Sequence, residues 1–182
     1  PTFVGFYKVP LRHGMTLGEL ARMHNAEQNL KADLTVIEIE NWRRDQWFDE
    51  TGLPWTNPSP NMRNLKQAML YPGVGLLESA LSVGRGTDTP FEVVGAPYID
   101  DVLFAEELNR AELPGVSFVP IRFTPASSVH QGQNCGGVYI MVNPERFRGC
   151  NVVDVGLQMA KTLHRLYPKD FNVQNFYYNM DL

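Results

Sequence analysis

Two long segments rich in proline and glycine divide the sequence and limit how long its regular elements can be. Residues 52–61 hold three prolines within seven positions. That segment is expected to be extended and stiff, because proline fixes φ and has no backbone N–H. Residues 84–97 form a second such segment, rich in glycine, threonine and proline. Loops of this length are uncommon in compact domains and are commonly functional, so we expect a site in them.

Short helices and strands are predicted around these loops. Thr16 followed by Glu19 is a capping box, in which each side chain satisfies a free backbone N–H, and it predicts a helix over residues 17–29. Further helices are predicted at 64–71, ended by Pro72 and Gly73, from Asp100 or Asp101 to 110, and at 154–167. Strands are predicted at 4–9, 34–39 (buried), 116–124 and 137–142, whereas the aromatic tail at 170–182 has no obvious packing partner within the chain.

The alternation of these elements indicates an α/β domain, with α+β as the alternative, in which helices flank a mixed sheet. A chain of 182 residues that is 43% hydrophobic is long enough for one sizeable core, so residues 1–182 are expected to form a single domain. The net charge of −4 argues against a nucleic-acid partner, and no apolar run is long enough to span a membrane. Cys135 and Cys150 fit either a disulfide or two reduced thiols.

The strongest local signal for a site is the sequence Gly84-Arg85-Gly86-Thr87-Asp88. Glycine on both sides of Arg85 allows positive φ and a close approach of the guanidinium to a ligand, and the guanidinium fork suits a carboxylate. Thr87 and Asp88 add a hydroxyl and a carboxylate that suit sugar hydroxyls. The alternative is an Arg–Asp pair that only holds the loop. A phosphate-binding loop is excluded, because the third glycine and the following helix are missing.

Other residues offer weaker candidates. His13 stands just before a predicted helix and either faces a ligand or bonds within its own turn. The carboxylates Glu78, Asp88 and Glu92 flank the second loop, and glycoside hydrolysis needs two carboxyl groups whose separation in space the sequence does not give. No two histidines have metal-ligand spacing, and no serine or cysteine nucleophile motif is present, so we expect neither a metal nor a cofactor.

Several blocks resemble one known family in the order in which that family has them. Residues 9–21 resemble its P-x-RHG-x-T-x-GELA block, residues 54–62 its PW…PSPNM block, and residues 71–97 its YPG…E…S-x-GRGT-x-x-PF-x-x-GAP block. The family is that of the peptidoglycan exo-β-N-acetylmuramidases (NamZ). Residues 78–82 depart from it, because this segment is one residue shorter and lacks a Thr-Asn pair.

The resemblance implies an exported (periplasmic or extracellular) glycoside hydrolase that releases N-acetylmuramic acid from peptidoglycan fragments during cell-wall turnover and recycling. The family has an N-terminal Rossmann-like half and a C-terminal half, with the active site between them. The whole chain resembles the C-terminal, substrate-binding half. The Pro-Glu-His-Gly block expected to carry the main catalytic acid is absent, so we expect the chain to be inactive without the N-terminal domain as its partner.

The resemblance also suggests roles for individual residues. Arg85 would hold the lactyl carboxylate of muramic acid, and Glu78 would orient Arg85 or assist as a second, catalytic carboxyl. Contacts to hydroxyls or the acetamido group would come from His13, Asn61, Thr87 and Asp88. The alternative is a non-catalytic module that binds cell-wall glycan.

Overall fold

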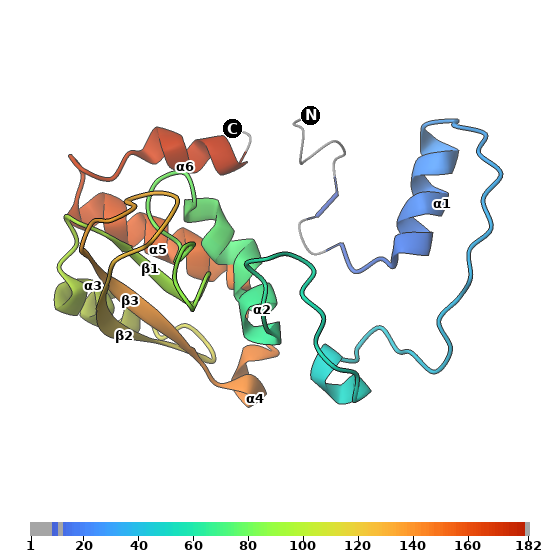
Figure 1. The fold of residues 1–182 in the computed structure, drawn as a ribbon, viewed down its shortest axis with the longest axis horizontal. Helices are drawn as coiled ribbons and strands as arrows, with labels where there is room; N and C mark the ends of the chain where they lie inside the picture. The colour runs from blue at the N-terminus through green and yellow to red at the C-terminus, as the bar shows by residue number, and fades with distance from the viewer. Residues whose placement is uncertain (1–8, 11–12, 181–182) are drawn as a thin grey trace. The chain divides into compact units, whose positions relative to one another are not determined.

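The computed structural model describes residues 9–10 and 13–180, with side chains described to residue 177. The predicted strand at 4–9 lies outside the described residues except for its last position. The chain divides into two compact units, Pro1–Leu53 and Pro54–Leu182 (Figure 1). The chain therefore does not form the single compact domain expected from the sequence.

Among its described residues, the first unit contains one α-helix. Helix α1 (Leu17–Glu27) begins with the predicted capping box, since Thr16 Oγ1 accepts from Glu19 N at 3.2 Å and Glu19 Oε2 accepts from Thr16 N at 2.8 Å. A single 3₁₀ turn, η1 (Phe48–Thr51), follows later. The buried strand predicted at 34–39 is wrong: the described chain there has no strand, and Ile37 is 86% exposed. A strand needs a neighbouring backbone, and the described part of this unit offers none.

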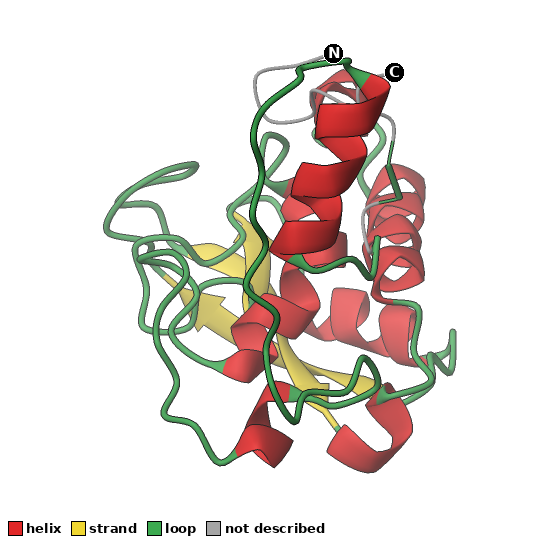
Figure 2. Cartoon of the chain, turned by 90° about the vertical axis from the view of Figure 1, so that its right-hand side faces the viewer, coloured by secondary structure: helices red, strands yellow, loops and turns green. Residues whose placement is uncertain are grey.

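The second unit is built on three strands, β1 (Val93–Ala96), β2 (Val116–Phe123) and β3 (Cys135–Val142). Figure 2 shows them side by side in one sheet, in the order β1-β3-β2. Both pairings are antiparallel, with Gly95 opposite Gly137 and Val119 opposite Tyr139. The predicted α/β class is confirmed, but the sheet is antiparallel rather than mixed. Strand β1 lies inside the predicted loop at 84–97.

The second unit also contains helices. They are α2 (Leu65–Val74), α3 (Asp101–Asn109), α4 (Pro144–Phe147), α5 (Val152–Leu166) and α6 (Val173–Met180), with the 3₁₀ turn η2 (Gly75–Leu77) after α2. Helix α3 packs on β2 and β3, and α2 packs on α5. The predicted cap of α3 is confirmed, because Asp100 Oδ1 accepts from Leu103 N at 2.9 Å.

Helix α2 continues past Pro72, where the sequence predicted its end. The reason is the packing of α2 against α5. A Cβ atom on Gly73 would lie 1.9 Å from Val152 O, and one on Gly156 would lie 2.2 Å from Gly73 O. The two helices therefore meet backbone to backbone, which holds the last turn of α2 despite the hydrogen bond that proline removes.

The core of the second unit lies where α2, α3 and α5 meet the sheet. Its largest fully buried side chains include Leu70, Leu77, Phe91, Phe104, Ile140 and Leu163. The tail, predicted to have no partner, belongs to this core: α6 packs on η2 and α5, and Phe171 and Phe176 are buried. Cys135 and Cys150 are both buried and are not joined in a disulfide.

Candidate functional site

The Gly84–Thr87 turn has the backbone that its sequence predicts. Gly84 has φ +79° and Gly86 has φ +78°, both in the left-handed region that favours glycine. Thr87 closes the turn, because its N–H donates to Gly84 O at 3.1 Å and its hydroxyl donates to the same oxygen at 2.7 Å. Thr87 Oγ1 also accepts from Thr89 N at 3.1 Å. The Thr87 hydroxyl is thus mainly engaged in shaping the turn.

Arg85 pairs with Glu78 and not with Asp88, the partner that the sequence offered as an alternative. Arg85 Nη2 donates to Glu78 Oε2 at 3.1 Å, and Arg85 Nε faces Glu78 Oε1 as an ion pair. The guanidinium also lies over the ring of Phe91, 5.0 Å from its centroid, and Tyr71 meets that ring edge-on at 4.9 Å. Both members of the ion pair remain partly accessible. Glu78 is therefore the carboxylate that pairs with Arg85, whereas Asp88 is exposed.

A second cluster, the Glu92 network, surrounds a carboxylate that is only 5% exposed. Glu92 Oε2 pairs with Lys66 Nζ at 2.8 Å and accepts from Tyr139 OH at 2.9 Å. Glu92 Oε1 accepts from Gln67 Nε2 at 2.9 Å and from Asn64 Nδ2 at 3.3 Å. Burial alone would raise the pKa of Glu92, but these hydrogen bonds together hold it below its ordinary value. The network joins the start of α2 to the sheet and leaves Glu92 poorly suited to donate a proton.

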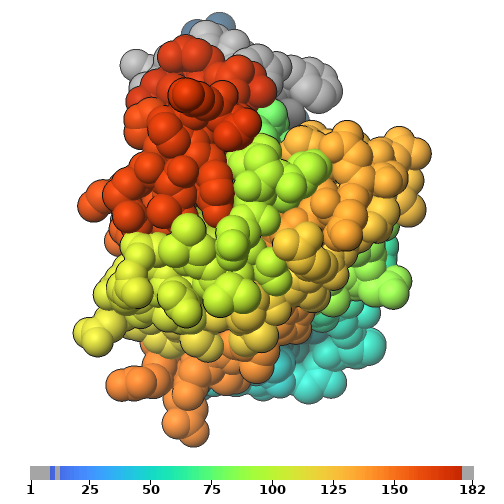
Figure 3. Space-filling model, turned by 90° about the vertical axis from the view of Figure 1, so that its left-hand side faces the viewer, coloured from blue at the N-terminus to red at the C-terminus, as the bar shows by residue number. Residues whose placement is uncertain are grey.

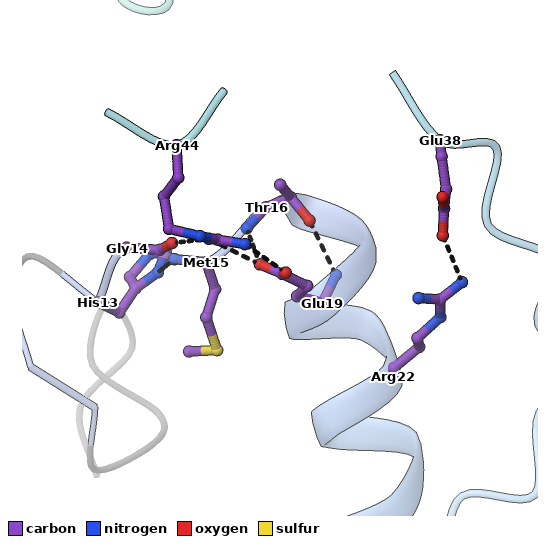
Figure 4. Close-up of polar contacts among 8 residues, drawn as sticks. All are labelled: His13, Gly14, Met15, Thr16, Glu19, Arg22, Glu38 and Arg44. Atoms are coloured by element: carbon purple, nitrogen blue, oxygen red, sulfur yellow. Dashed lines mark hydrogen bonds and ion pairs between the residues drawn. The ribbon is translucent and has the colours of Figure 1, made fainter. Parts of the chain in front are cut away.

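The first unit has a polar cluster of its own around Glu19 (Figure 4). Arg44 donates to both oxygens of Glu19, at 3.1 and 2.6 Å, and to Gly14 O. The hydrogen bond from Arg44, followed by that from the Thr16 backbone, lowers the pKa of Glu19 to about 2. His13 Nδ1 accepts from Met15 N at 3.1 Å. His13 thus makes a hydrogen bond within its own turn, which is one of the two alternatives that the sequence left open.

A groove lies between α1 and the extended segment at 36–39. It encloses about 500 Å³ and is lined by apolar and charged side chains, among them Leu17, Arg22, Val36, Ile37 and Trp42. Arg22 crosses it to pair with Glu38 at 3.5 Å (Figure 4). No residue of α1 is buried. The apolar side chains of this unit therefore have little cover among its described residues.

The structure brings only some of the predicted site residues together. Glu78, Arg85, Thr87 and Asp88 share one loop region of the second unit, Asn61 lies half-buried in the first long loop of that unit, and His13 belongs to the other unit. The sequence missed the Glu92 network, apart from Glu92 as a flanking carboxylate. Within the described residues, no group of three His, Cys, Asp or Glu side chains could hold a metal ion, and no helix is long and apolar enough to cross a membrane.

Solved structures with this fold include two DUF1343 family proteins from Bacteroides fragilis. One superposes with a TM-score of 0.85 at 30% identity and covers 98% of this chain and 48% of its own. The other has a TM-score of 0.70 at 29% identity and covers 97% of this chain and 47% of its own. The chain therefore shares its α/β fold with these DUF1343 family proteins.

Family assignment follows from the sequence. Residues 69–182 match the family described as exo-beta-N-acetylmuramidase NamZ, C-terminal, and residues 1–66 match its N-terminal counterpart. The chain belongs to the NamZ family. It is 47% identical over 172 residues to the peptidoglycan beta-N-acetylmuramidase NamZ of Bacillus subtilis, and the match covers 93% of this chain but 41% of that relative.

The family match also divides the chain differently from the sequence prediction. That prediction placed all residues in the C-terminal half, whereas residues 1–66, including His13 and Asn61, match the N-terminal family. Glu78, Arg85, Thr87 and Asp88 fall within the C-terminal match. The candidate residues therefore come from both parts of the family's architecture.

Proposed function

We propose that the chain is part of an exo-acting glycoside hydrolase that releases N-acetylmuramic acid from peptidoglycan fragments. Support comes from membership of the NamZ family and from the Bacillus subtilis relative, a peptidoglycan muramidase. The observation that carries the proposal is the guanidinium of Arg85, oriented by Glu78 between two glycines with positive φ. That arrangement suits a ligand carboxylate, and the lactyl carboxylate distinguishes muramic acid from glucosamine.

The proposed clamp uses the free edge of the guanidinium. Among the described residues, Glu78 faces the Nε and Nη2 side of Arg85. Arginine has five N–H donors in a planar fork, so the Nη1 side is left for a carboxylate of the ligand. Glu78 then acts as the positioning residue of Arg85, or as a second carboxyl at the reacting bond. Asn61, Thr87, Asp88 and His13 remain proposed contacts to hydroxyls or the acetamido group.

Arg85→Gln tests the clamp in an enzyme that contains this chain. Loss of a charge-assisted contact worth about 1.5–3 kcal/mol should lower kcat/KM by about 10- to 150-fold on a substrate ending in muramic acid. Arg146→Gln, at an exposed arginine on α4, is the matched control and should leave kcat/KM unchanged. Equal kcat/KM for Arg85→Gln and wild type would exclude a carboxylate clamp at this residue.

We further propose that the first unit packs against the remainder of an N-terminal NamZ domain, the partner expected from the sequence. The whole of this unit lies within the N-terminal family match, which covers residues 1–66, and the Bacillus subtilis relative is more than twice as long as the region matched. Leu17 and Ile37 are each 86% exposed and Ile39 is 70% exposed. The β-branched segment at 34–39 would add a strand to a sheet of that domain, because such a segment is stable only beside another strand.

Size-exclusion chromatography tests this interface. The chain is mixed with the part of the Bacillus subtilis relative that it does not cover, and the two should co-elute. Ile37→Lys should abolish co-elution because it places a charge in an apolar interface. Gln28→Lys adds the same charge at an exposed polar position beside α1 and should not. Separate elution of the wild-type chain would refute the interface.

Export and a role in cell-wall turnover belong to the same proposal and rest on the family's properties. The chain by itself is proposed to be inactive, because glycoside hydrolysis needs two placed carboxyl groups. Turnover of a chromogenic muramic acid glycoside by the isolated chain would contradict this.

A non-catalytic cell-wall glycan-binding module is the second candidate. It is favoured by two of the carboxylates that flank the second loop: Glu78 pairs with Arg85, and Glu92 accepts four hydrogen bonds. Neither is arranged as a free acid. One assay distinguishes the two candidate functions. An enzyme that contains this chain hydrolyses the chromogenic muramic acid glycoside, whereas a binding module binds it without cleaving it.

A further inference from the structure

The loop between β2 and β3 packs on the Gly84–Thr87 turn. Ala126 N donates to Gly86 O at 2.9 Å. A Cβ atom on Gly86 would lie 2.3 Å from Ser127 N, so the contact requires glycine at position 86. In the space-filling view, gold surface borders yellow-green surface, the colours of residues near 125 and near 100 (Figure 3). The residue next to Arg85 is therefore held by a second loop, which the resemblance did not include.

This loop is closed on itself and carries two unusual backbone conformations. Gly132 N donates to Pro125 O at 2.8 Å, and Gln131 N donates to Ser128 O at 3.2 Å. Ser128 has φ +70° and His130 has φ +61°, although neither is glycine. Non-glycine residues in the left-handed region are strained and persist where the surrounding structure holds them. The closed loop thus constrains the backbone that carries His130.

The imidazole of His130 is incompletely satisfied. Its Nε2 atom is buried and has no hydrogen-bond partner among the described residues. Burial lowers the pKa of His130, which keeps the ring neutral near pH 7. A buried polar atom without a partner destabilises the free protein, and a ligand group that hydrogen-bonds it removes that cost. A neutral imidazole nitrogen either accepts from a hydroxyl or donates to a carbonyl, depending on its tautomer.

We propose that His130 is a further ligand-binding residue of the Arg85 site, and that its Nε2 hydrogen-bonds a hydroxyl or the acetamido carbonyl of the sugar whose carboxylate Arg85 holds. The assignment rests on the proposed function, since it takes N-acetylmuramic acid as the ligand. It adds a neutral contact from the β2–β3 loop to the charged contact from the Gly84–Thr87 turn. Two loops, joined at Gly86, then hold one sugar from different sides of its ring.

His130→Asn tests the assignment in this chain. Asparagine tolerates positive φ, so the loop keeps its backbone while the imidazole is lost. Binding of N-acetylmuramic acid, measured by calorimetry, should weaken about tenfold. Ser128→Asn is the matched control, because it makes the same replacement at the other left-handed position of the loop and retains His130. Its affinity should equal that of wild type.

The imidazole resonances of wild type give a second measurement that does not depend on a variant. The His130 ring signals, assigned by their loss in His130→Asn, should shift on saturation with N-acetylmuramic acid. Unshifted signals together with equal affinity in His130→Asn would overturn the assignment, and Nε2 would then bond only to water. If wild type does not bind N-acetylmuramic acid, the proposed function fails and the assignment fails with it. Binding by wild type that Arg85→Gln abolishes and His130→Asn leaves intact refutes the assignment alone.

Discussion

Replacing Glu92 by glutamine removes the charge at the centre of the Glu92 network and keeps the shape of the side chain. Lys66 would lose an ion-pair partner at 2.8 Å, and its side chain is only 26% exposed. Removing one member of a buried pair costs about 3–5 kcal/mol, and access of water to Lys66 offsets part of this. We expect Glu92→Gln to lower the free energy of unfolding by about 2–4 kcal/mol, because one buried charge loses its partner. For a chain of this length the melting temperature should fall by about 5–15 °C.

The stability lost in Glu92→Gln should be larger at neutral pH than at acid pH. Because the pKa of Glu92 is held below its ordinary value, its contribution to stability is complete above roughly pH 4.5 and is lost as the pH falls through the folded-state pKa. The difference in unfolding free energy between wild type and Glu92→Gln should therefore shrink between pH 7 and pH 3.

Urea unfolding followed by circular dichroism at both pH values measures this difference. Glu145→Gln, at an exposed carboxylate on α4, is the control and should change stability by less than about 0.5 kcal/mol. A Glu92→Gln variant as stable as this control at pH 7 would show that the network adds nothing to stability. A difference that stays constant with pH would show that the charge is not its cause.

Two further predictions concern the helix contact and the first unit. Gly156→Ala should destabilise the second unit by several kcal/mol, because the added Cβ would lie 2.2 Å from Gly73 O. Gly149→Ala is the control and should be tolerated, because its Cβ would lie 3.9 Å from the nearest atom. Thermal unfolding of the two variants measures the difference. Carbon-detected NMR titration should give Glu19 a pKa of about 2, and Arg44→Gln should return it towards its ordinary value of 4.5. An unchanged Glu19 pKa in that variant would mean that Arg44 is not the main cause.

The sequence predicted correctly the features that depend on neighbouring residues. The caps at Thr16 and Asp100 formed as predicted, because a capping side chain reaches backbone groups only three residues away. Positive φ at Gly84 and Gly86 also follows from local sterics. Membership of the NamZ family, indicated by blocks of local sequence, is confirmed by the family matches.

Features that depend on distant residues were predicted less well. The direction of neighbouring strands is not written in any one strand, so the antiparallel sheet and the short strand β1 were missed. Pro72 did not end α2, since α5 supports the helix from outside. The Glu92 network joins groups 25 and 47 positions apart in the sequence, and no local pattern relates them. The roles of Arg85, Glu78 and the other site residues stay predictions.

The backbone contact of α2 with α5 has a consequence for how sequences of this family vary. With no side chain between Gly73 and Gly156, the helices cannot adjust their separation by exchanging one residue for another of different size. Lys66, in the first turn of α2, belongs to the Glu92 network, and α2 leads through η2 to Glu78 beside Arg85. Because the glycine contact lies between Lys66 and Glu78 along the chain, we expect the surroundings of these two residues to change together during evolution. Among relatives, replacements around Lys66 should therefore accompany replacements around Glu78, with the glycine pair unchanged.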